Sequence, residues 1–259
     1  MELKFSKYHG AGNDFVMIDN RDGVFGEPTV EKIKKICDRH KGIGADGIIL
    51  LNDSEGIDFK MRYFNADLGD ETMCGNGTRC IVAFARELGI IQNQARFLAH
   101  DGAHEADVLP DGNIAVKMAD VAFPQKHGEG FVCDTGCPHY VEVRKDIENL
   151  DLIPFAQEIR YSQDFPNGVN VNVIEMKEGA IPMRTYERGV EDETLACGTG
   201  AVAVAVTLAK DAPDGQETEY VLDAKGGTLK IKLTKKDDHF ENVWLIGPAE
   251  KAFEGIVSL

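Results

Sequence analysis

Two short segments of the sequence repeat one another, and this repeat constrains the fold more than any other feature. Cys-Gly-Asn-Gly occupies positions 74–77 and Cys-Gly-Thr-Gly positions 197–200, which is 197 − 74 = 123 positions apart in a chain of 259 residues. A strand-like stretch with polar residues at its end precedes each copy, and an apolar segment of helical length follows each. Two copies in matching surroundings predict a duplicated unit: two similar domains that face each other across a cleft.

The remaining sequence contains many strand-like stretches and few helical patterns. Helices are predicted at Pro28–His40, Asn76–Gly89 and Gly198–Lys210. The last of these reads AVAVAVTLA and has the propensity of a buried strand, but its length and its Gly-Thr-Gly entry favour a buried helix. Many short strands with a few central helices predict an α+β fold.

The charge balance and the hydrophobic content exclude several classes of protein. The chain has 28 Lys and Arg residues against 44 Asp and Glu residues, a net charge of −16, which repels the phosphate backbone of nucleic acids. Hydrophobic residues make up 43% of the chain, enough for a sizeable core. No apolar run approaches the roughly 18–20 residues of a membrane helix, and residues 1–15 lack the apolar stretch of a secretory signal. We therefore expect a cytoplasmic protein that binds neither nucleic acid nor membranes.

Six cysteines are present, and we expect free thiols rather than a disulfide framework in a chain of this length. No Cys-x-x-Cys pair occurs, so neither a zinc ribbon nor a thioredoxin-type site is indicated. Cys133, Cys137 and His139 would supply three metal ligands, but no fourth ligand follows at a recognisable spacing, and we predict no metal. A buried packing role suits Cys37 and Cys80.

A buried packing role does not explain the cysteines that begin the two repeated motifs, because packing alone does not require flanking glycines. At the start of a buried helix, the N–H groups of the first turn have no partner within the helix. Glycines let a ligand approach that backbone, and the helix dipole favours an anion and a thiolate there. Two such helix ends facing one another would hold a carboxylate and place a thiol on each side of the adjacent carbon. This arrangement predicts racemisation or epimerisation without a cofactor, with one cysteine as thiolate and the other as thiol.

Several further segments accompany the two motifs: KYHGAGNDF at 7–15, FNAD at 64–67, MCGNGTRC at 73–80, Pro-His at 138–139, NVN at 170–172, YERG at 186–189, ETLACGTG at 193–200 and GPAE at 247–250. With these segments, the sequence resembles the diaminopimelate epimerase family along nearly its whole length. The resemblance implies an isomerase that interconverts LL- and meso-2,6-diaminopimelate, a step of lysine and peptidoglycan precursor biosynthesis. It also implies that no cofactor is used.

The resemblance further implies roles for individual residues. Cys74 and Cys197 would be the acid–base pair, and His139 and Glu187 would be polar neighbours that tune the thiols. The residues that would bind substrate are Asn13, Asn65, Gly75, Asn76, Asn170, Glu187, Arg188, Gly198 and Thr199. The chemistry agrees, because Arg suits a carboxylate, Glu suits an ammonium group and Asn can serve either.

The resemblance also implies an architecture. We expect two pseudo-symmetric domains, each a mainly antiparallel sheet wrapped around a central helix. Residues 1–120, joined by a C-terminal strand at about 250–259, would form one domain, and residues 121–249 the other. A homodimer is an expectation from the family alone.

The sequence departs from the family's pattern at three places. Cys137 stands where the family often has Asn before the Pro-His pair, so a weak donor replaces an amide. Residues 65–69 read Asn-Ala-Asp-Leu-Gly in place of Asn-Ala-Asp-Gly. Gly47 stands near a position where some members have Gln, and glycine offers only backbone groups.

Two alternative functions remain open. A proline or hydroxyproline racemase of the same fold also uses two cysteines beside glycines, but that group typically has His in place of Asn76. Arg188 also fits a second carboxylate better than it fits proline. A non-enzymatic thiol or metal-binding protein would use a set of cysteines with one histidine, and the irregular spacing of these residues argues against it. The set is Cys74, Cys80, Cys133, Cys137 and His139.

Overall fold

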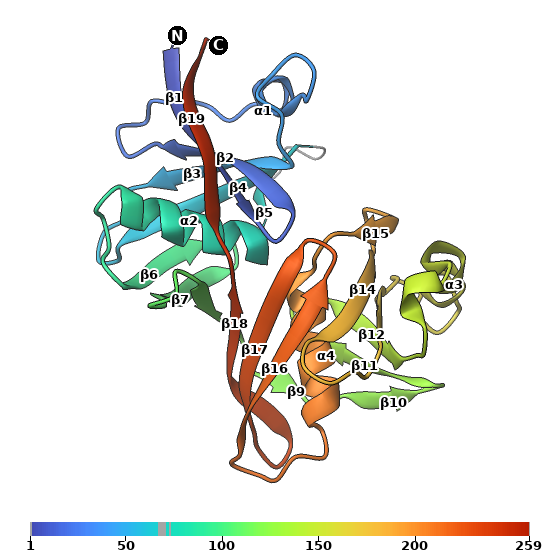
Figure 1. Cartoon of the computed structure of the whole chain (residues 1–259). Helices are drawn as coiled ribbons and strands as arrows, with labels where there is room; N and C mark the ends of the chain where they lie inside the picture. The colour runs from blue at the N-terminus through green and yellow to red at the C-terminus, as the bar shows by residue number, and fades with distance from the viewer. Residues whose placement is uncertain (1, 67–70, 73, 259) are drawn as a thin grey trace. The chain divides into compact units, whose positions relative to one another are not determined.

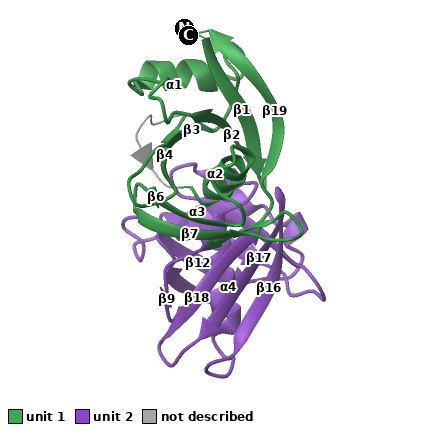
Figure 2. Cartoon of the chain, turned by 90° about the vertical axis from the view of Figure 1, so that its left-hand side faces the viewer, with its two compact units in different colours: residues 1–116, 247–259 green, residues 117–246 purple. Residues whose placement is uncertain are grey.

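The computed structural model describes residues 2–66, 71–72 and 74–258 (Figure 1). The chain forms two compact units, residues 1–116 with 247–259 and residues 117–246 (Figure 2). Strands dominate both units and helices are few in the described residues, which confirms the mixed, strand-rich fold class predicted from the sequence. In that part of the chain, no helix is both long and apolar enough to cross a membrane.

The first unit contains two helices and most of the N-terminal strands. Its elements are β1 (Glu2–Gly10), β2 (Asn13–Asp19), α1 (Val30–Cys37), β3 (Gly47–Asn52), β4 (Phe59–Asn65), β5 (Glu71–Thr72), α2 (Gly75–Glu87), β6 (Gln94–Ala99), β7 (Gly102–Val108), β8 (Ile114–Lys117) and β19 (Glu250–Ser258). The last strand, drawn red in Figure 1, pairs antiparallel with β1, so the two ends of the chain lie side by side. The strands pair in the order β19-β1-β2-β3-β4-β6-β7-β8.

The second unit is built from the middle of the chain. Its elements are β9 (Val121–Ala122), β10 (Gln125–His127), β11 (Gly130–Asp134), β12 (Pro138–Val143), the short helix η1 (Ile147–Asn149), α3 (Leu152–Arg160), β13 (Asn170–Ile174), β14 (Ile181–Glu187), β15 (Asp192–Thr194), α4 (Gly198–Ala209), β16 (Glu217–Ala224), β17 (Gly227–Lys235) and β18 (His239–Gly247). The strands pair in the order β10-β11-β12-β13-β14-β16-β17-β18-β9.

The two units repeat the same order and direction of strand pairing. Starting from β1 in one unit and from β11 in the other, successive pairs are antiparallel, parallel, antiparallel, parallel, antiparallel and antiparallel. A short strand, β5 or β15, pairs with β4 or β14. The helix that follows it, α2 or α4, begins directly after Cys74 or Cys197. Each cysteine therefore has the same place in the topology of its unit.

Helix α4 forms from a sequence whose valines favour strands. Residues 201–206 are completely buried, and the helix packs against β11, β12, β13, β16 and β17. As a helix, such a segment needs no neighbouring strand, because a helix pairs its own backbone N–H and C=O groups. A helix that is apolar on all sides is stable only when it is enclosed in this way. The predicted helix at Gly198–Lys210 is confirmed.

Helix α2 has the corresponding place in the first unit, where Figure 2 shows strands on several sides of it. It packs against β1, β2, β3, β4 and β7. Gly89 follows its last turn with a φ of 72°, a conformation that glycine adopts without strain. The N–H of Gly89 donates to the carbonyl of Arg86 and that of Ile90 to the carbonyl of Ala85, both at 3.0 Å, which ends the helix in a Schellman motif. The helix predicted at Asn76–Gly89 is confirmed and ends slightly earlier.

Helix α1 is shorter than the predicted Pro28–His40. It begins after Thr29, whose hydroxyl accepts the N–H of Lys32 at 3.3 Å. It ends before Asp38, whose carboxylate accepts the N–H groups of His40 and Lys41 at 2.7 and 2.8 Å. These local bonds offer the backbone an alternative to the helix, so the last residues of the predicted segment form a turn.

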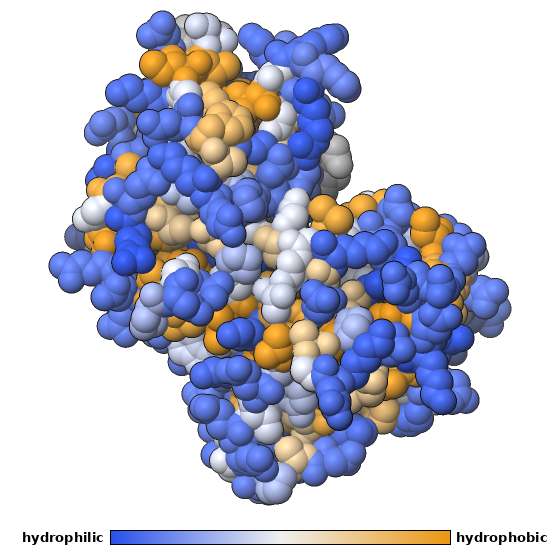
Figure 3. All heavy atoms as spheres, viewed as in Figure 1, coloured by the Kyte–Doolittle hydropathy of each residue, from blue (hydrophilic) through white to orange (hydrophobic). Residues whose placement is uncertain are grey.

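The outer surface agrees with the acidic composition. The face drawn in Figure 3 is covered mainly by hydrophilic residues, with apolar atoms in smaller groups among them. With 44 Asp and Glu residues against 28 Lys and Arg, mutual repulsion between molecules favours solubility.

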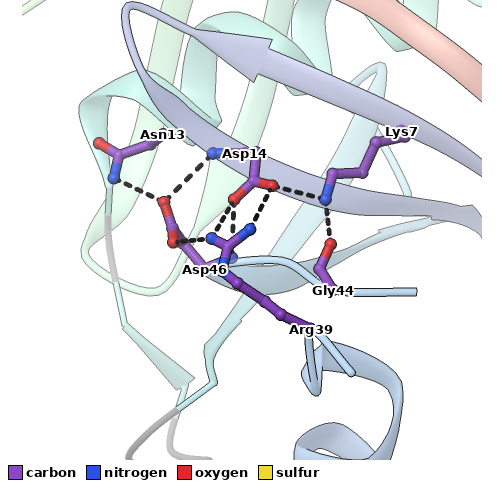
Figure 4. A network of polar contacts seen from close by, with 6 residues as sticks. All are labelled: Lys7, Asn13, Asp14, Arg39, Gly44 and Asp46. Atoms are coloured by element: carbon purple, nitrogen blue, oxygen red, sulfur yellow. Dashed lines mark hydrogen bonds and ion pairs between the residues drawn. The ribbon is translucent and has the colours of Figure 1, made fainter. Parts of the chain in front are cut away.

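A network of charged residues fixes the start of β2 (Figure 4). The Asp14 carboxylate accepts hydrogen bonds from Lys7 Nζ at 2.6 Å and from Arg39 at 2.8 Å, and Arg39 also bonds Asp46 at 2.7 Å. Lys7 is 6% exposed and also donates to the carbonyl of Gly44. Burial by itself would raise the pKa of Asp14, but the hydrogen bonds and charges of Arg39 and Lys7 outweigh it and lower the pKa to about 2. The ionised carboxylate therefore contributes to stability.

We predict that Asp14→Asn lowers the free energy of unfolding by about 2 kcal/mol at neutral pH, because the variant loses an anion that two cations stabilise. A depressed carboxyl pKa gives stability that is present above the unfolded value of 3.8 and is lost as the pH falls toward about 2. The difference between variant and wild type should therefore shrink over this pH range. Urea unfolding at several pH values measures it. The exposed Asp22→Asn serves as control, and an equal effect in both variants would contradict the assignment.

Candidate active site

Cys74 marks the first of two groups of candidate site residues, which lies in unit 1. Cys74 has an extended backbone (φ −143°, ψ 117°) and is the residue directly before α2. Its carbonyl accepts the N–H and the hydroxyl of Thr78 at 2.8 and 3.0 Å, which ties the cysteine to the first turn. The N–H groups of this turn include those of Gly75 and Asn76, and the helix has no carbonyl of its own to pair with them.

A chain of side-chain hydrogen bonds runs through Asn76 and fixes its amide. The guanidinium of Arg79, which is completely buried, donates from Nη2 to Asn76 Oδ1 at 2.9 Å. Asn76 Nδ2 donates to Asn13 Oδ1 at 2.5 Å, and Asn13 Nδ2 donates to Asp46 Oδ2 at 2.9 Å. The side chain of Asn76 is thereby held within the protein, with 3% of the residue exposed. Asn13 and Asn76, both predicted from the sequence, are in contact.

Asn65 lies at the end of β4, opposite Gly47 on β3. It is half-buried and forms a hydrogen bond with Tyr63. A Cβ atom at Gly47 would lie 2.6 Å from the carbonyl oxygen of Phe64, so backbone packing requires glycine at position 47. Asp67 and Met73, which belong to the segments that resemble the family, lie outside the described residues. The turn at 65–69 lies largely outside them too.

Cys197 marks the second group, in unit 2, where it caps α4. Its Sγ accepts the N–H of Gly200 at 3.4 Å and lies 3.4 Å from the hydroxyl of Thr199. Burial raises the pKa of the Cys197 thiol well above its usual value, and the negative charge of Glu187 raises it further. The hydrogen bonds from Thr199 and Gly200 act in the opposite direction. The surroundings in unit 2 thus favour the thiol form of Cys197.

Glu187 ends β14 beside Cys197. Its carboxylate accepts the hydroxyl of Thr194 at 2.5 Å and a hydrogen bond from the Cys197 thiol. Burial raises the pKa of Glu187, while the two hydrogen bonds lower it in part. Glu187 can therefore interact directly with the sulfur of Cys197.

His139 lies on β12 and is completely buried. Its Nε2 is 3.0 Å from the hydroxyl of Thr199 and 3.2 Å from the Cys137 sulfur. Its Nδ1 is 3.0 Å from Nδ2 of Asn172 on β13. Burial, assisted by the positive charge of Arg188, lowers the pKa of His139 to about 3. The ring is therefore neutral at physiological pH.

Asn170 connects this group to Arg188 and Cys137. Its Oδ1 accepts the backbone N–H of Arg188 at 2.8 Å, and its Nδ2 donates to the Cys137 sulfur at 3.2 Å. The Arg188 side chain is exposed, and Nη1 donates to the carbonyl of Asn167 at 3.0 Å. Cys137, the departure from the family pattern, therefore contacts three polar side chains of the group: His139, Asn170 and Thr199.

The cysteines considered as metal ligands are not arranged around one point. The Cys133 sulfur faces the carbonyl of Ala203 at 3.9 Å, whereas the Cys137 sulfur contacts His139. In the described ranges, no group of three or more His, Cys, Asp or Glu side chains could hold a metal ion.

Sequence reasoning missed three residues that hold the candidate site together: Asn172, Asp46 and Arg79. The sequence contains a signal for one of them, Asn172. Asn170 and Asn172 alternate along a strand with buried valines, so both side chains point to the same face. Two amides on one buried face require polar partners. Asp46 and Arg79 gave no comparable signal, because their partners lie far away in the sequence.

Comparison with known proteins identifies the family of this chain. A family model described as diaminopimelate epimerase matches residues 5–124 and 131–252. Diaminopimelate epimerase of Flavobacterium psychrophilum is 42% identical over 254 residues, which cover 97% of this chain and 99% of that protein. The enzyme of the same name from Aquifex aeolicus is 39% identical over 276 residues, with coverages of 99% and 98%.

Solved structures of other proteins share the fold at low sequence identity. A Bacillus anthracis phenazine biosynthesis protein of the PhzF family superposes with a TM-score of 0.78 at 16% identity, over the whole of both chains. A hydroxyproline epimerase from Agrobacterium vitis gives a TM-score of 0.66 at 14% identity, covering 100% of this chain and 93% of that one. These likenesses concern the fold alone, whereas the family model and the relatives at about 40% identity span nearly the whole sequence. The chain belongs to the diaminopimelate epimerase family, a family of isomerases.

Proposed function

We propose that this chain interconverts LL- and meso-2,6-diaminopimelate with two thiols, Cys74 and Cys197, and without a cofactor. One observation carries the assignment of the thiols. Each cysteine directly precedes a helix that is enclosed by its unit, at the same point of a repeated order of strands. A pair of residues in equivalent positions suits a reaction whose two directions use two acid–base groups in exchanged roles.

The reaction consists of removing the α-proton from one face of the carbon and adding a proton to the other face. A thiolate takes the proton as the base, and the second cysteine, present as a thiol, donates its own proton. In the reverse direction the two cysteines exchange roles. For this chemistry the two units would face each other across a cleft as pseudo-symmetric domains. In that arrangement, residues 1–120 with the strand at about 250–259 provide Cys74, and residues 121–249 provide Cys197.

The carboxylate next to the reacting carbon would bind to the two helix ends. Gly75 and Asn76 at the start of α2, and Gly198 and Thr199 at the start of α4, offer N–H groups of first turns. An anion is favoured at a helix N-terminus by the helix dipole. When the carboxylate is bound there, these N–H donors stabilise the negative charge that develops on it as the α-proton leaves. Closure of the cleft would exclude water and strengthen both effects.

The remaining polar residues suit the far end of the substrate. Arg188 can bind the distal carboxylate through its guanidinium, and Glu187 can bind an ammonium group. Asn13, Asn65 and Asn170 can serve either group. The hydrogen bond that Asn170 Oδ1 accepts from the backbone N–H of Arg188 supports this assignment, since it fixes the backbone from which the arginine side chain extends.

In the resting protein we assign Cys197 as the thiol. Burial and the charge of Glu187 both raise the pKa of Cys197, which supports its role as the proton donor in the first half of the reaction. His139 and Glu187 act as the neighbours that adjust this thiol. The proposal also includes a homodimer and a cytoplasmic location, which rest on the resemblance and the composition.

We predict that Cys74→Ala and Cys197→Ala each reduce epimerisation by about 10³-fold or more, because each variant lacks one of two required proton carriers. The measurement is proton NMR of LL-diaminopimelate in heavy water with reduced protein. Wild type should lose the α-proton signal and form the meso isomer.

Cys37→Ala, which alters a cysteine of α1, should retain most of the activity. Turnover near the wild-type level in either Ala variant of the motif cysteines would disprove the two-thiol mechanism. L-Proline runs as a parallel sample, and exchange with proline alone would assign the chain to the rival racemases.

We predict that Arg188→Ala raises KM strongly, since the distal carboxylate loses its guanidinium partner. Arg188→Lys should recover part of the loss, because the charge remains but the planar fork does not. Initial rates over a range of LL-diaminopimelate concentrations give KM and kcat. Lys177→Ala, at another exposed cation of unit 2, is the control. Unchanged KM and kcat in Arg188→Ala would place the distal carboxylate elsewhere.

A further inference from the structure

A line of buried hydrogen bonds lies behind Cys197 and begins at Asn172, a residue without a role in the proposed chemistry. Asn172 Nδ2 lies 3.0 Å from His139 Nδ1. His139 Nε2 lies 3.0 Å from the hydroxyl of Thr199, and this hydroxyl lies 3.4 Å from the Cys197 sulfur. Asn172 and His139 are both completely buried, so water does not compete for these contacts.

The surroundings of Asn172 determine which end of its amide faces His139. Nδ2 lies 3.0 Å from the carbonyl oxygen of Tyr140, which can only accept a hydrogen bond. Oδ1 lies 3.0 Å from the hydroxyl of Thr185, which donates to it. The nitrogen end must therefore point toward Tyr140, and the same nitrogen faces the histidine ring. Both of its hydrogens are used, one on each acceptor.

Gly200, the last residue of the second repeated motif, makes room for this amide. A Cβ atom at Gly200 would lie 2.5 Å from Asn172 Oδ1, closer than any side chain tolerates. The glycine thus has a packing role in addition to its place in the helix start. The amide and the helix that carries Cys197 fit together only because position 200 has no side chain.

The orientation of Asn172 fixes the tautomer of His139. Nδ1 receives an N–H from the amide, so it must be the unprotonated ring nitrogen. In the neutral ring the proton is then on Nε2, which faces the hydroxyl of Thr199 and the Cys137 sulfur. Nδ2 of Asn170 lies farther from Nε2, at 3.4 Å, and donates to the Cys137 sulfur at 3.2 Å. The single lone pair of the ring is occupied by Asn172, and His139 is thereby a donor and not an acceptor toward the thiols.

We infer that Asn172 is a positioning residue, which holds His139 as the Nε2–H tautomer so that the Thr199 hydroxyl is free to donate to the Cys197 sulfur. The ring donates to the Thr199 oxygen, and the hydroxyl hydrogen then points away from His139. Its acceptors are the sulfurs of Cys197 at 3.4 Å and of Cys137 at 3.5 Å. This donation stabilises a Cys197 thiolate each time the cysteine has lost its proton. The inference rests on the proposed role of Cys197.

We predict that His139 in the full-length protein has a protonated Nε2 and an unprotonated Nδ1 near neutral pH. Nitrogen-15 NMR of protein labelled at histidine distinguishes the two ring nitrogens, and His139→Gln identifies the signals among the seven histidines. Asn172→Asp should place a proton on Nδ1, because a carboxylate has no N–H to donate. Thr185→Val is the matched control: it removes the bond to Oδ1, leaves Nδ2 in place and should keep the wild-type tautomer.

A protonated Nδ1 in the neutral wild-type ring would overturn the inference. An unchanged tautomer in folded Asn172→Asp would overturn it as well. Neither readout uses turnover, so a protein without epimerase activity would still report the tautomer of His139. Failure of the inference and failure of the proposed function are therefore distinguishable.

We also predict that Thr199→Val slows alkylation of Cys197 by iodoacetamide about threefold at fixed pH. Loss of one hydrogen bond to a charged sulfur lowers the thiolate fraction about tenfold, and the greater nucleophilicity of the less stabilised thiolate offsets part of this loss. Mass spectrometry of the Cys197 peptide measures the rate, with the Cys37 peptide as internal control. Thr199→Ser should return the rate to near wild type. Equal rates in Thr199→Val and wild type would show that the hydroxyl does not donate to Cys197.

Discussion

The first turn of a buried helix, whose N–H groups have no partners within the helix, is the constraint on which the rest of this structure depends. A helix inside a protein pairs its own interior backbone groups but leaves the N–H groups of its first turn without helical partners. Both α2 and α4 are enclosed by the strands of their own unit, and each begins directly after a cysteine. Strand pairing of the same order and direction surrounds each helix, so each unit delivers a thiol and a set of donors at an equivalent point.

The two helix starts are supported by different chemistry. In unit 1 a buried guanidinium, Arg79, holds the amide of Asn76, which in turn holds Asn13. In unit 2 a neutral imidazole, His139, lies between Asn172 and Thr199. The two helix starts thus have the same place in the topology of their units but different electrostatic surroundings. In the proposed mechanism the two thiols are in different protonation states at the start of each turnover, and unlike surroundings are compatible with that requirement.

Much of the fold was accessible from the sequence, and the exceptions have physical reasons. The helices after the two motifs were predicted because each is an apolar run of helical length, and the Schellman motif at Gly89 ends one of them. Helix α3 was not predicted, because its stability comes from tertiary packing. Leu152 and Ala156 pack in one cluster with Val171 and Tyr186, which lie later in the sequence. Helix α1 was predicted too long because Asp38 bonds to the following backbone instead.

The sequence by itself determined the repeated cysteine motifs, the family and the class of chemistry, because these depend on residue types at short spacings. Only the tertiary structure decided the hydrogen bonds that orient the site. Pairs such as Asn172 with His139, 33 positions apart, and Asn76 with Asn13, 63 positions apart, meet because strand pairing and helix burial bring them together. It also decided that Gly47 and Gly200 are required for packing, since the atoms that exclude a side chain belong to neighbouring elements. Local patterns specify many of the elements, whereas contacts between distant segments decide others, such as α3, and specify how the side chains are held.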